Sequence, residues 1–341
     1  MTREADRRSI LRGMKGAMRL LQDLGYDQGA KRAQRVDVFD CIDRRGAALM
    51  FQRLDKLLGA FMKQGDAAGI ILNTERPLGM QRFTAAHELG HLVLGHDPHA
   101  DDEGILRRGP IPDGSTYKRV PPEEREADAF ASYFLLPSHL ITAQMEVQSW
   151  GVHHFTSPEV VYQASLRFGT SYAGAVYGLE RESVITRGMR QELLKSKPRD
   201  LKLEMLDGQP LPNSRRSDVW LLTERDEGAV IEAGRDDLFQ LRLNEATGAG
   251  YVWTFDEMKA AGFAILKDGR EPVPEGEIGS PTVRRILAQA GYPTSNTLRL
   301  KECRPWDPED DPQTLTLHYR TATSDEAGLF ERQRLERLVL Q

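Results

Sequence analysis

Two histidines stand four residues apart in the stretch FTAAHELGHLVLGH, residues 83–96, and a glutamate directly follows the first. Residues four apart share one face of a helix, so the ring nitrogens of His87 and His91 can reach one metal ion. Glu88 lies beside them, where its carboxylate can take a proton from a water molecule whose pKa zinc has lowered. Burying three polar groups in an otherwise apolar helix would be costly without an ion. The stretch therefore predicts a zinc site, with Glu88 as general base.

Two histidines do not complete a zinc site, and the segment EEREADAFASYFLLP, residues 123–137, is the candidate source of a third ligand. Glu124 and Asp128 are four residues apart and would share one helical face. A glutamate can complete the site, and an acid one turn later can hydrogen-bond a ligand histidine. Glu123 and Glu126 remain alternatives for the ligand, because spacing alone does not fix the rotation of the helix.

Apolar spacing and turn residues predict the elements that position these motifs. Helices are expected over residues 5–24 and 30–45, followed by a small sheet in AALMFQRL, LLGAFMK and GIILN. Both motifs lie on predicted helices, separated by a long polar loop over residues 97–122. Residues 157–186 predict a helix, a glycine turn and a second helix with Ser171 as N-cap, similar to a helix-turn-helix.

The bulk composition indicates a two-domain protein of mixed α+β class. A chain of 341 residues exceeds one ordinary core, and composition changes over residues 198–214, where we place a linker. Residues 1–197 would form the zinc domain with its helical segment, and the alternating strands of residues 215–341 predict an antiparallel β-sandwich. We find no signal peptide and no apolar run of membrane-spanning length, and the two cysteines fit a reducing cytoplasm.

Positive charge gathers near both ends of the zinc domain, although the net charge is −5. Such runs usually form solvated helix faces, and the alternative is contact with nucleic acid phosphates. We hypothesise that they bind single-stranded DNA as an activating signal. The candidate contacts are Arg7, Arg8, Arg12, Lys15, Arg187, Arg190, Lys195 and Lys197.

The cysteines Cys41 and Cys303 are interpreted as ordinary buried thiols. The alternative is that one thiolate supplies a regulatory fourth zinc ligand, since thiolates bind zinc well. The residue that stabilises the oxyanion is also open. Its candidates are Tyr117, Tyr133, Tyr172 and Tyr177.

Taken together, GIILNTERPLGMQRFTAAHELGHLVLGH and EREADAFASYFLLP resemble the ImmA/IrrE family of zinc metallopeptidases, over roughly residues 25–185. The resemblance implies His87, His91 and Glu124 as metal ligands, Glu88 as general base and Asp128 as the residue that orients a ligand. It also implies limited cleavage of a helix-turn-helix transcriptional repressor. Such cleavage relieves repression of stress, DNA-damage or phage-defence genes.

A second resemblance covers roughly residues 215–323, where DDLFQLRLNEATGAGYVWTF and CRPWD are similar to the chagasin-like inhibitor fold. The asparagine and proline of that family's inhibitory loop are absent here. The resemblance therefore implies a β-sandwich, but not inhibition of cysteine proteases. We expect a sensing or docking role for this domain, with a structural role as the alternative.

Two other classes of function stay open. One is a DNA-binding regulator in which zinc is structural, although a structural site needs no general base such as Glu88. The other is an interaction module that binds a protein partner without cleaving it.

Overall fold

The chain folds into two compact units, one reaching Pro198 and the other beginning at Arg199. Among the residues described, none of the helices has the length and apolarity that a membrane span requires. The computed structural model describes residues 2–54, 57–97, 99–102, 121–213, 217–234, 236–271, 282–290, 295–307 and 313–322.

The first unit combines helices with one sheet. Its helices are α1 (Thr2–Asp23), α2 (Val38–Arg44), α3 (Leu78–Leu94), α5 (Pro122–Leu135), α6 (Ser138–Gln148), α7 (Pro158–Phe168), α8 (Tyr172–Arg181) and α9 (Arg187–Leu193), with short 3₁₀ turns η1 (Gly29–Ala33) and η3 (Val152–Thr156). Its strands are β1 (Ala47–Gln52), β2 (Leu57–Gln64), β3 (Ala67–Asn73) and β4 (His99–Asp102).

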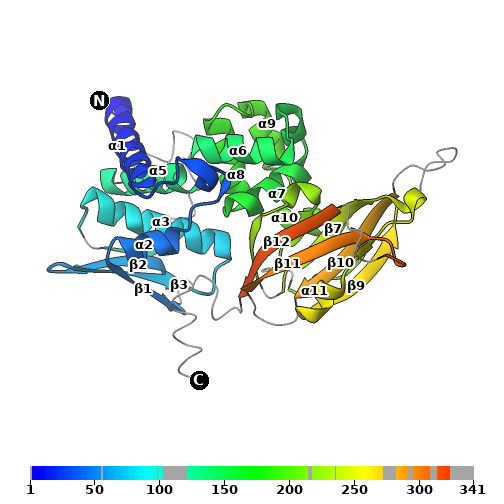
Figure 1. Cartoon of the computed structure of the whole chain (residues 1–341). Coiled ribbons are helices and arrows are strands. Elements are labelled where there is room, and N and C mark those ends of the chain that lie inside the picture. Colours follow the sequence, from blue (N-terminus) through cyan, green and yellow to red (C-terminus); the bar gives the residue numbers. More distant parts are fainter. Residues whose placement is uncertain are drawn as a thin grey trace, which may run out of the picture. The chain divides into compact units, whose positions relative to one another are not determined.

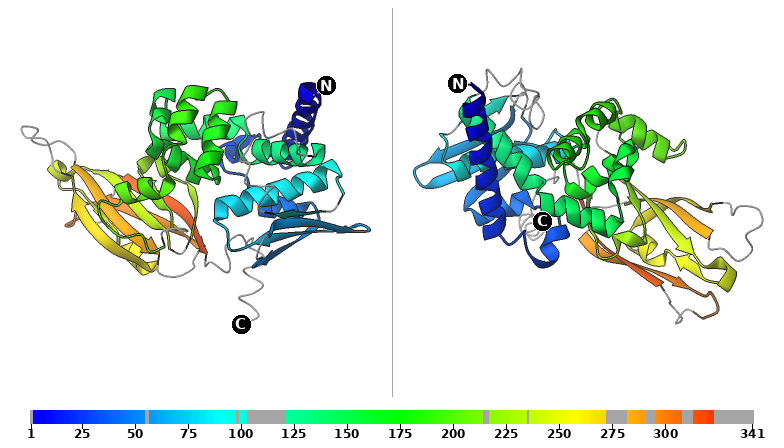
Figure 2. Two further views of the ribbon diagram at one scale, coloured as in Figure 1. Left: turned by 180° about the vertical axis from the view of Figure 1, so that it is seen from behind. Right: turned by 90° about the horizontal axis from the view of Figure 1, so that it is seen from above.

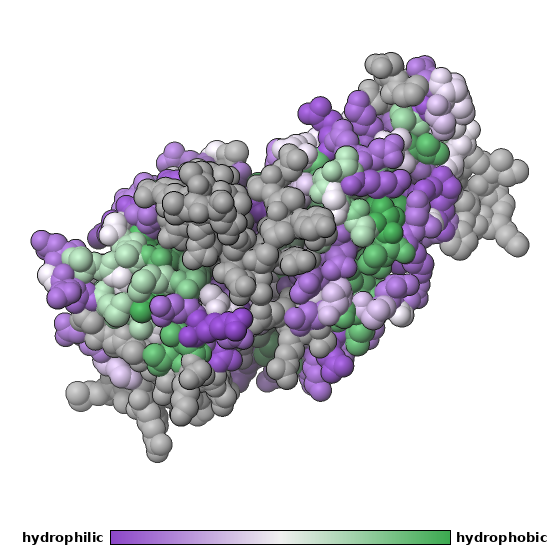
Figure 3. All heavy atoms as spheres, turned by 90° about the horizontal axis from the view of Figure 1, so that it is seen from below, coloured by the Kyte–Doolittle hydropathy of each residue, from purple (hydrophilic) through white to green (hydrophobic). Residues whose placement is uncertain are grey.

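The described strands form a sheet of order β1-β3-β2-β4, in which β1 and β3 run parallel and the other pairs are antiparallel. Helix α3 lies across one face of the sheet, with α5 and α1 beyond it (Figures 1 and 2). Phe61 and Ile70 from the strands, Leu89 from α3 and Phe130 from α5 are buried in the core between these layers. The outer face keeps partly exposed methionines, and Figure 3 shows apolar residues gathered on the side of this unit that it views.

Two predicted elements differ in the structure. The helix expected over residues 30–45 is wrong in its first half, because α2 begins only at Val38. Asp37 sets that start, since its carboxylate accepts a hydrogen bond from the Asp40 amide at 3.2 Å. The polar segment after α3 was expected to be loop, but His99–Asp102 forms β4 and pairs with β2. Residues 103–120 of that segment lie outside the described residues.

The predicted pair of helices around a glycine turn is confirmed in α7 and α8. Gly169 ends α7 with φ of 71°, a left-handed conformation that favours glycine. The Ser171 hydroxyl then caps α8 by accepting a hydrogen bond from the Gly174 amide at 3.1 Å.

The second unit begins with α10 (Pro198–Met205), inside the segment interpreted as a linker. The buried ammonium of Lys202 on this helix pairs with the Asp218 carboxylate at 2.8 Å and donates to the Ser217 carbonyl at 2.7 Å. Leu206, just after the helix, joins an apolar cluster with strand residues such as Val219. The first part of the predicted linker is therefore folded with the second unit.

In the rest of the second unit, the described strands form a β-sandwich of two four-stranded sheets, ordered β5-β7-β10-β9 and β6-β12-β11-β8. Phe263 of one sheet and Tyr319 of the other meet edge to face, with ring centroids 5.1 Å apart. Each sheet has one parallel pair, β5 with β7 and β6 with β12, where only antiparallel pairs were expected. The strands are β5 (Val219–Leu222), β6 (Val230–Gly234), β7 (Leu238–Glu245), β8 (Val252–Thr254), β9 (Phe263–Arg270), β10 (Thr282–Ala290), β11 (Ser295–Cys303) and β12 (Gln313–Ala322), with α11 (Asp256–Ala260) and the 3₁₀ turns η4 (Glu224–Asp226) and η5 (Thr247–Ala249).

Candidate metal centre

Helices α3 and α5 bring three metal-ligating side chains together inside the first unit. The Nε2 atoms of His87 and His91 lie 3.1 Å apart. The Glu124 carboxylate approaches both rings, with one oxygen 3.3 Å from His87 Nε2 and the other 3.6 Å from His91 Nε2. All three side chains are buried, and their ligand atoms lie within 4.8 Å of one another.

A glycine in the motif lets the two helices come this close. A Cβ atom at Gly90 would lie 3.1 Å from the Phe130 Cβ and 3.2 Å from the Ala127 Cα, tighter than ordinary packing. Helix α5 begins at Pro122, so Glu124 falls in its first turn and meets α3 near His87 and His91.

The rotation of α5, which spacing left open, is visible in the structure. Glu123 is exposed to solvent, whereas Glu124 lies with the two histidines. The Glu126 carboxylate instead lies 3.0 Å from His96 Nε2. Asp128 Oδ1 lies 3.0 Å from His87 Nδ1, on the opposite side of the ring from Glu124. This is where a carboxylate that orients a ligand histidine should lie.

His96 is a residue of the site that the motif analysis missed. Its Nδ1 lies 2.9 Å from His91 Nδ1, so it contacts His91 as Asp128 contacts His87. The sequence did contain a signal, because Gly95 precedes it and glycine commonly ends a helix in a left-handed conformation. That ending turns the next residue back toward the last turn of the helix.

Glu88 is fully buried beside the ligands, and the backbone of β2 passes against it. A Cβ atom at Gly59 would lie 3.2 Å from Glu88 Oε1 and 2.5 Å from the Thr84 Cγ2 methyl. Glycine at this position therefore allows the strand to approach the helix at the level of the carboxylate.

The donor set fits a divalent metal ion such as zinc. Two imidazoles and one carboxylate form a three-ligand zinc set known from catalytic sites. Each histidine has its Nδ1 held by another side chain, by Asp128 or by His96, so each presents its Nε2 toward Glu124. The ligand atoms are thus oriented as a metal-binding set requires.

The cysteines lie elsewhere. Cys41 on α2 is fully buried in the apolar core, and burial, together with Asp37 and Asp40, raises the pKa of its thiol to about 12. Cys303 lies at the end of β11 in the second unit. Neither residue belongs to the group of ligand atoms found in the described part of the chain, so a cysteine ligand gains no support there.

The predicted nucleic-acid contacts divide into two sets. Arg8, Arg12 and Lys15 of α1 line one groove with Arg19 and Arg45. The second set lies on α9 and just after it, and none of its members lines that groove: Arg187, Arg190, Lys195 and Lys197. Arg7, outside the groove lining, is exposed.

Two of these cations are already paired with partly or fully buried carboxylates. Arg12 Nη1 lies 2.7 Å from Glu126 Oε2, and Arg190 Nη1 lies 2.7 Å from Glu180 Oε2. Two more form exposed ion pairs, Lys195 with Glu192 at 2.7 Å and Arg8 with Glu4 at 3.8 Å. The exposed pairs cost little to break, whereas the other two pairs also give Arg12 and Arg190 a structural role.

The tyrosines considered for the oxyanion have different surroundings. Tyr172 is buried, its hydroxyl donates to the Leu193 carbonyl at 2.9 Å, and burial raises its pKa to about 12. The Tyr133 ring lies under the Arg181 guanidinium at 4.2 Å, and Tyr177 lines a hollow that also contains Arg181. Tyr117 lies outside the described residues.

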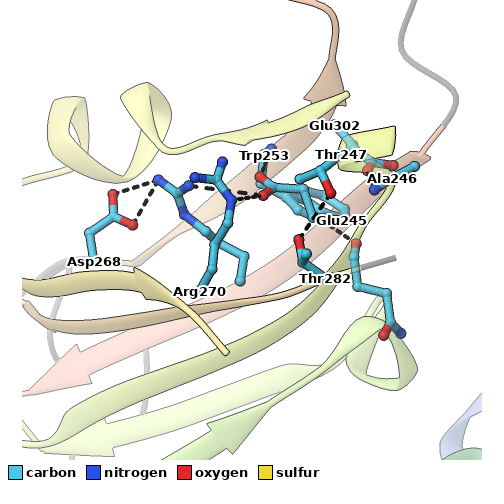
Figure 4. A network of polar contacts seen from close by, with 10 residues as sticks. Glu245, Ala246, Thr247, Trp253, Asp268, Arg270, Thr282 and Glu302 are labelled. Atoms are coloured by element: carbon cyan, nitrogen blue, oxygen red, sulfur yellow. Dashed lines mark hydrogen bonds and ion pairs between the residues drawn. The ribbon is translucent and has the colours of Figure 1, made fainter. Parts of the chain in front are cut away.

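In the second unit, buried acids hold the loop that follows β7. Glu245 accepts a hydrogen bond from the Trp253 amide at 2.9 Å and pairs with Arg270 Nε at 2.5 Å (Figure 4). Glu302 accepts from the Ala246 amide at 2.6 Å. Beside this loop, against Gly250, lies Trp306, whose surface is 72% exposed.

Comparisons with known proteins match both units. The model of Peptidase_M78, the IrrE N-terminal-like domain, matches residues 43–180, and the chagasin family of peptidase inhibitors matches residues 232–320. Amoebiasin-2 from Entamoeba histolytica is 28% identical over 96 residues, which cover 28% of this chain and 77% of that protein.

Solved structures similar to the second unit include the cysteine protease inhibitor EhICP2 from Entamoeba histolytica. It shares 22% identity with a TM-score of 0.26, over 31% of this chain and 97% of that chain. The solution structure of Amebosin gives the same identity and TM-score over 98% of its own chain.

Both resemblances predicted from the motifs are thereby confirmed. The chain carries a metallopeptidase-type IrrE N-terminal-like domain at residues 43–180 and a chagasin-family domain at residues 232–320.

Proposed function

We propose that this protein is a cytoplasmic zinc-dependent endopeptidase that makes a limited cut in a helix-turn-helix transcriptional repressor. The observation that carries the proposal is the buried group of His87, His91 and Glu124 with Glu88 beside it, in a domain of a peptidase family. Glu88 is fully buried beside this group, at a place where peptide hydrolysis needs a carboxylate.

In this proposal each side chain has one task. His87, His91 and Glu124 would hold the ion, which when bound supplies the polarisation of water and of the peptide carbonyl. Glu88 accepts a proton from the attacking water at its carboxylate and returns it to the departing amide nitrogen. Asp128 holds His87 through Nδ1 and keeps its Nε2 directed at the ligand group.

The repressor as substrate follows from the resemblance to the ImmA/IrrE family. Cleavage there would relieve repression of stress, DNA-damage or phage-defence genes, and a protease of this kind must be inactive until a signal arrives. We propose single-stranded DNA as that signal. The basic groove beside α1 supports it, since Arg8, Lys15 and Arg19 can contact successive phosphates.

For the chagasin-family unit we propose a sensing or docking role. Its exposed Trp306 lies beside a loop that Glu245 and Glu302 hold in place, and exposed aromatic side chains commonly anchor protein partners.

The test mixes the zinc-loaded protein with the helix-turn-helix repressor encoded nearest its gene, with and without a single-stranded oligonucleotide. Intact mass spectrometry should find one cut, and Glu88→Gln should slow it by about 10²–10⁴-fold while zinc stays bound. A cut in both lanes would keep the protease and remove the DNA signal. A repressor recovered whole in both would favour the alternative, a non-catalytic DNA- or protein-binding regulator with structural zinc.

A further inference from the structure

We propose that His96, held by Glu126 and Arg12, positions the metal ligand His91. These three residues, here called the Arg12–Glu126–His96 network, run from helix α1 through α5 to the end of α3. The inference rests on the proposed metal centre and adds to it a supporting role for three side chains besides Asp128.

The backbone itself brings His96 under His91. Gly95 follows the last residue of α3 with φ of 72°, and its amide donates to the Leu92 carbonyl at 3.4 Å. The His96 amide donates to the His91 carbonyl at 3.0 Å. This pair of bonds is the Schellman motif, which satisfies carbonyls of the last turn and turns the chain back along the helix. Residues 91 and 96 are thereby linked through both backbone and side chain.

The hydrogen-bond directions in the network are consistent with only one arrangement once His91 offers Nε2 to an ion. His91 then carries its proton on Nδ1 and donates to His96 Nδ1, 2.9 Å away. His96 must carry its own proton on Nε2, which donates to the Glu126 carboxylate at 3.0 Å. The network therefore selects the tautomer of His91 that binds metal.

Arg12 completes the network from a different helix. Its Nη1 pairs with Glu126 Oε2 at 2.7 Å, and its Nη2 donates to the Leu94 carbonyl at 2.9 Å. The guanidinium thus compensates the charge of a buried carboxylate and also caps the last turn of α3. Gly13 makes the reach possible, because a side chain there would overlap the Glu126 carbonyl oxygen where α1 crosses α5.

His87 shows what such support does at the other ligand. Its Nδ1 is held by one carboxylate, Asp128, directly. At His91, the imidazole of His96 lies against Nδ1 and connects the ring to the Glu126 carboxylate. The two ligand rings are therefore supported in equivalent ways, one by a single side chain and the other by a network.

The test measures zinc affinity in the absence of substrate, by competition with a fluorescent chelator. His96→Phe keeps the ring volume but removes both nitrogens, and should weaken zinc binding by about 10–100-fold. His96→Asn should weaken it less, because its side-chain oxygen can take the place of Nδ1. Arg12→Gln should weaken it too, and should add little on top of His96→Phe, since both act through Glu126.

The matched control is Asp6→Asn. It removes a charge that also joins α1 to α5, through Arg125 Nη1 at 2.5 Å, but has no contact with His91. Zinc affinity of this variant should stay within about twofold of wild type. The visible spectrum of bound Co²⁺ should change in His96→Phe and not in Asp6→Asn, which separates altered ligand geometry from a loss of packing.

Zinc affinity of His96→Phe within about twofold of wild type would overturn the proposal. If circular dichroism shows that His96→Phe does not fold, the same criterion applies to Arg12→Gln. A wild type that binds zinc but cuts no repressor would contradict the proposed function and leave this inference standing.

Discussion

Cys41 and His91 lie in the same compact unit, yet their surroundings favour metal binding by His91 and disfavour it at Cys41. Each imidazole nitrogen of His91 lies next to a polar side chain, whereas the Cys41 thiol is fully buried in the apolar core, with Tyr26 as a polar neighbour. Burial holds the pKa of Cys41 at about 12, so at neutral pH it is a thiol, and the thiolate is the form that binds zinc. Cys41 could bind zinc only if the apolar core of the first unit opened and exposed its sulfur.

We therefore expect Cys41→Ala to leave zinc affinity unchanged and to lower the free energy of unfolding by about 1–2 kcal/mol. The loss comes from the contacts of a fully buried sulfur. Chelator competition measures the first quantity and urea denaturation of the metal-free protein the second. A tenfold or greater loss of zinc affinity would instead identify Cys41 as a ligand.

Residue spacing predicted part of the site and could not predict the rest. His87, Glu88 and His91 follow from their positions on one helix, because helical geometry is local. The choice among Glu123, Glu124 and Glu126 does not, since the rotation of α5 is set by packing against α3 and α1. Only the tertiary structure shows that the Glu126 carboxylate contacts His96 rather than the ligand group.

At the scale of elements, the ends of the helices decide where functional side chains lie. Where the local signal is strong, the sequence predicted the helix ends correctly, as the glycine turn and serine cap between α7 and α8 show. Elements with a weak local signal were not predicted. The short strand β4 contains polar residues and pairs with β2, a long-range contact that no local pattern indicates.

The glycine end of α3 gives a prediction at this scale. A Cβ atom at Gly95 would meet nothing within 4 Å, so Gly95→Ala should cost only the strain of its left-handed backbone, about 1 kcal/mol. Gly95→Asn should cost less, because asparagine tolerates that conformation. Thermal or urea unfolding of the metal-free variants measures both, and equal stability of the alanine variant and wild type would contradict the described helix end.

At the scale of the whole molecule, the net charge does not show where charged side chains lie. The net charge is −5, yet basic side chains line a groove at α1. The structure also shows that Arg12 in that groove is paired with Glu126. The same side chain thus lies where phosphates would bind and supports His91. Arg8, Lys15 and Arg19 are the residues on which the proposed DNA contact depends.

The composition changes from helical to β-rich over residues 198–214, where we place a linker, and in the structure the second unit begins at Arg199. Helix α10 has the composition of a polar linker. It packs with the second unit, where buried Lys202 forms an ion pair with Asp218 and donates a hydrogen bond to the Ser217 carbonyl. Such long-range pairs have no local signature. The comparisons that cover residues 43–180 and 232–320 likewise leave this segment unassigned.

The central claim is that His87, His91 and Glu124 hold a zinc ion beside a general base, and metal stoichiometry with activity tests it most directly. Native mass spectrometry should find about one zinc in wild type and in Glu88→Gln, and a large loss of zinc in Glu124→Gln. Repressor cleavage should fall by about 10²-fold or more in both variants. Zinc bound as tightly in Glu124→Gln as in wild type, or full cleavage by Glu88→Gln, would contradict the account.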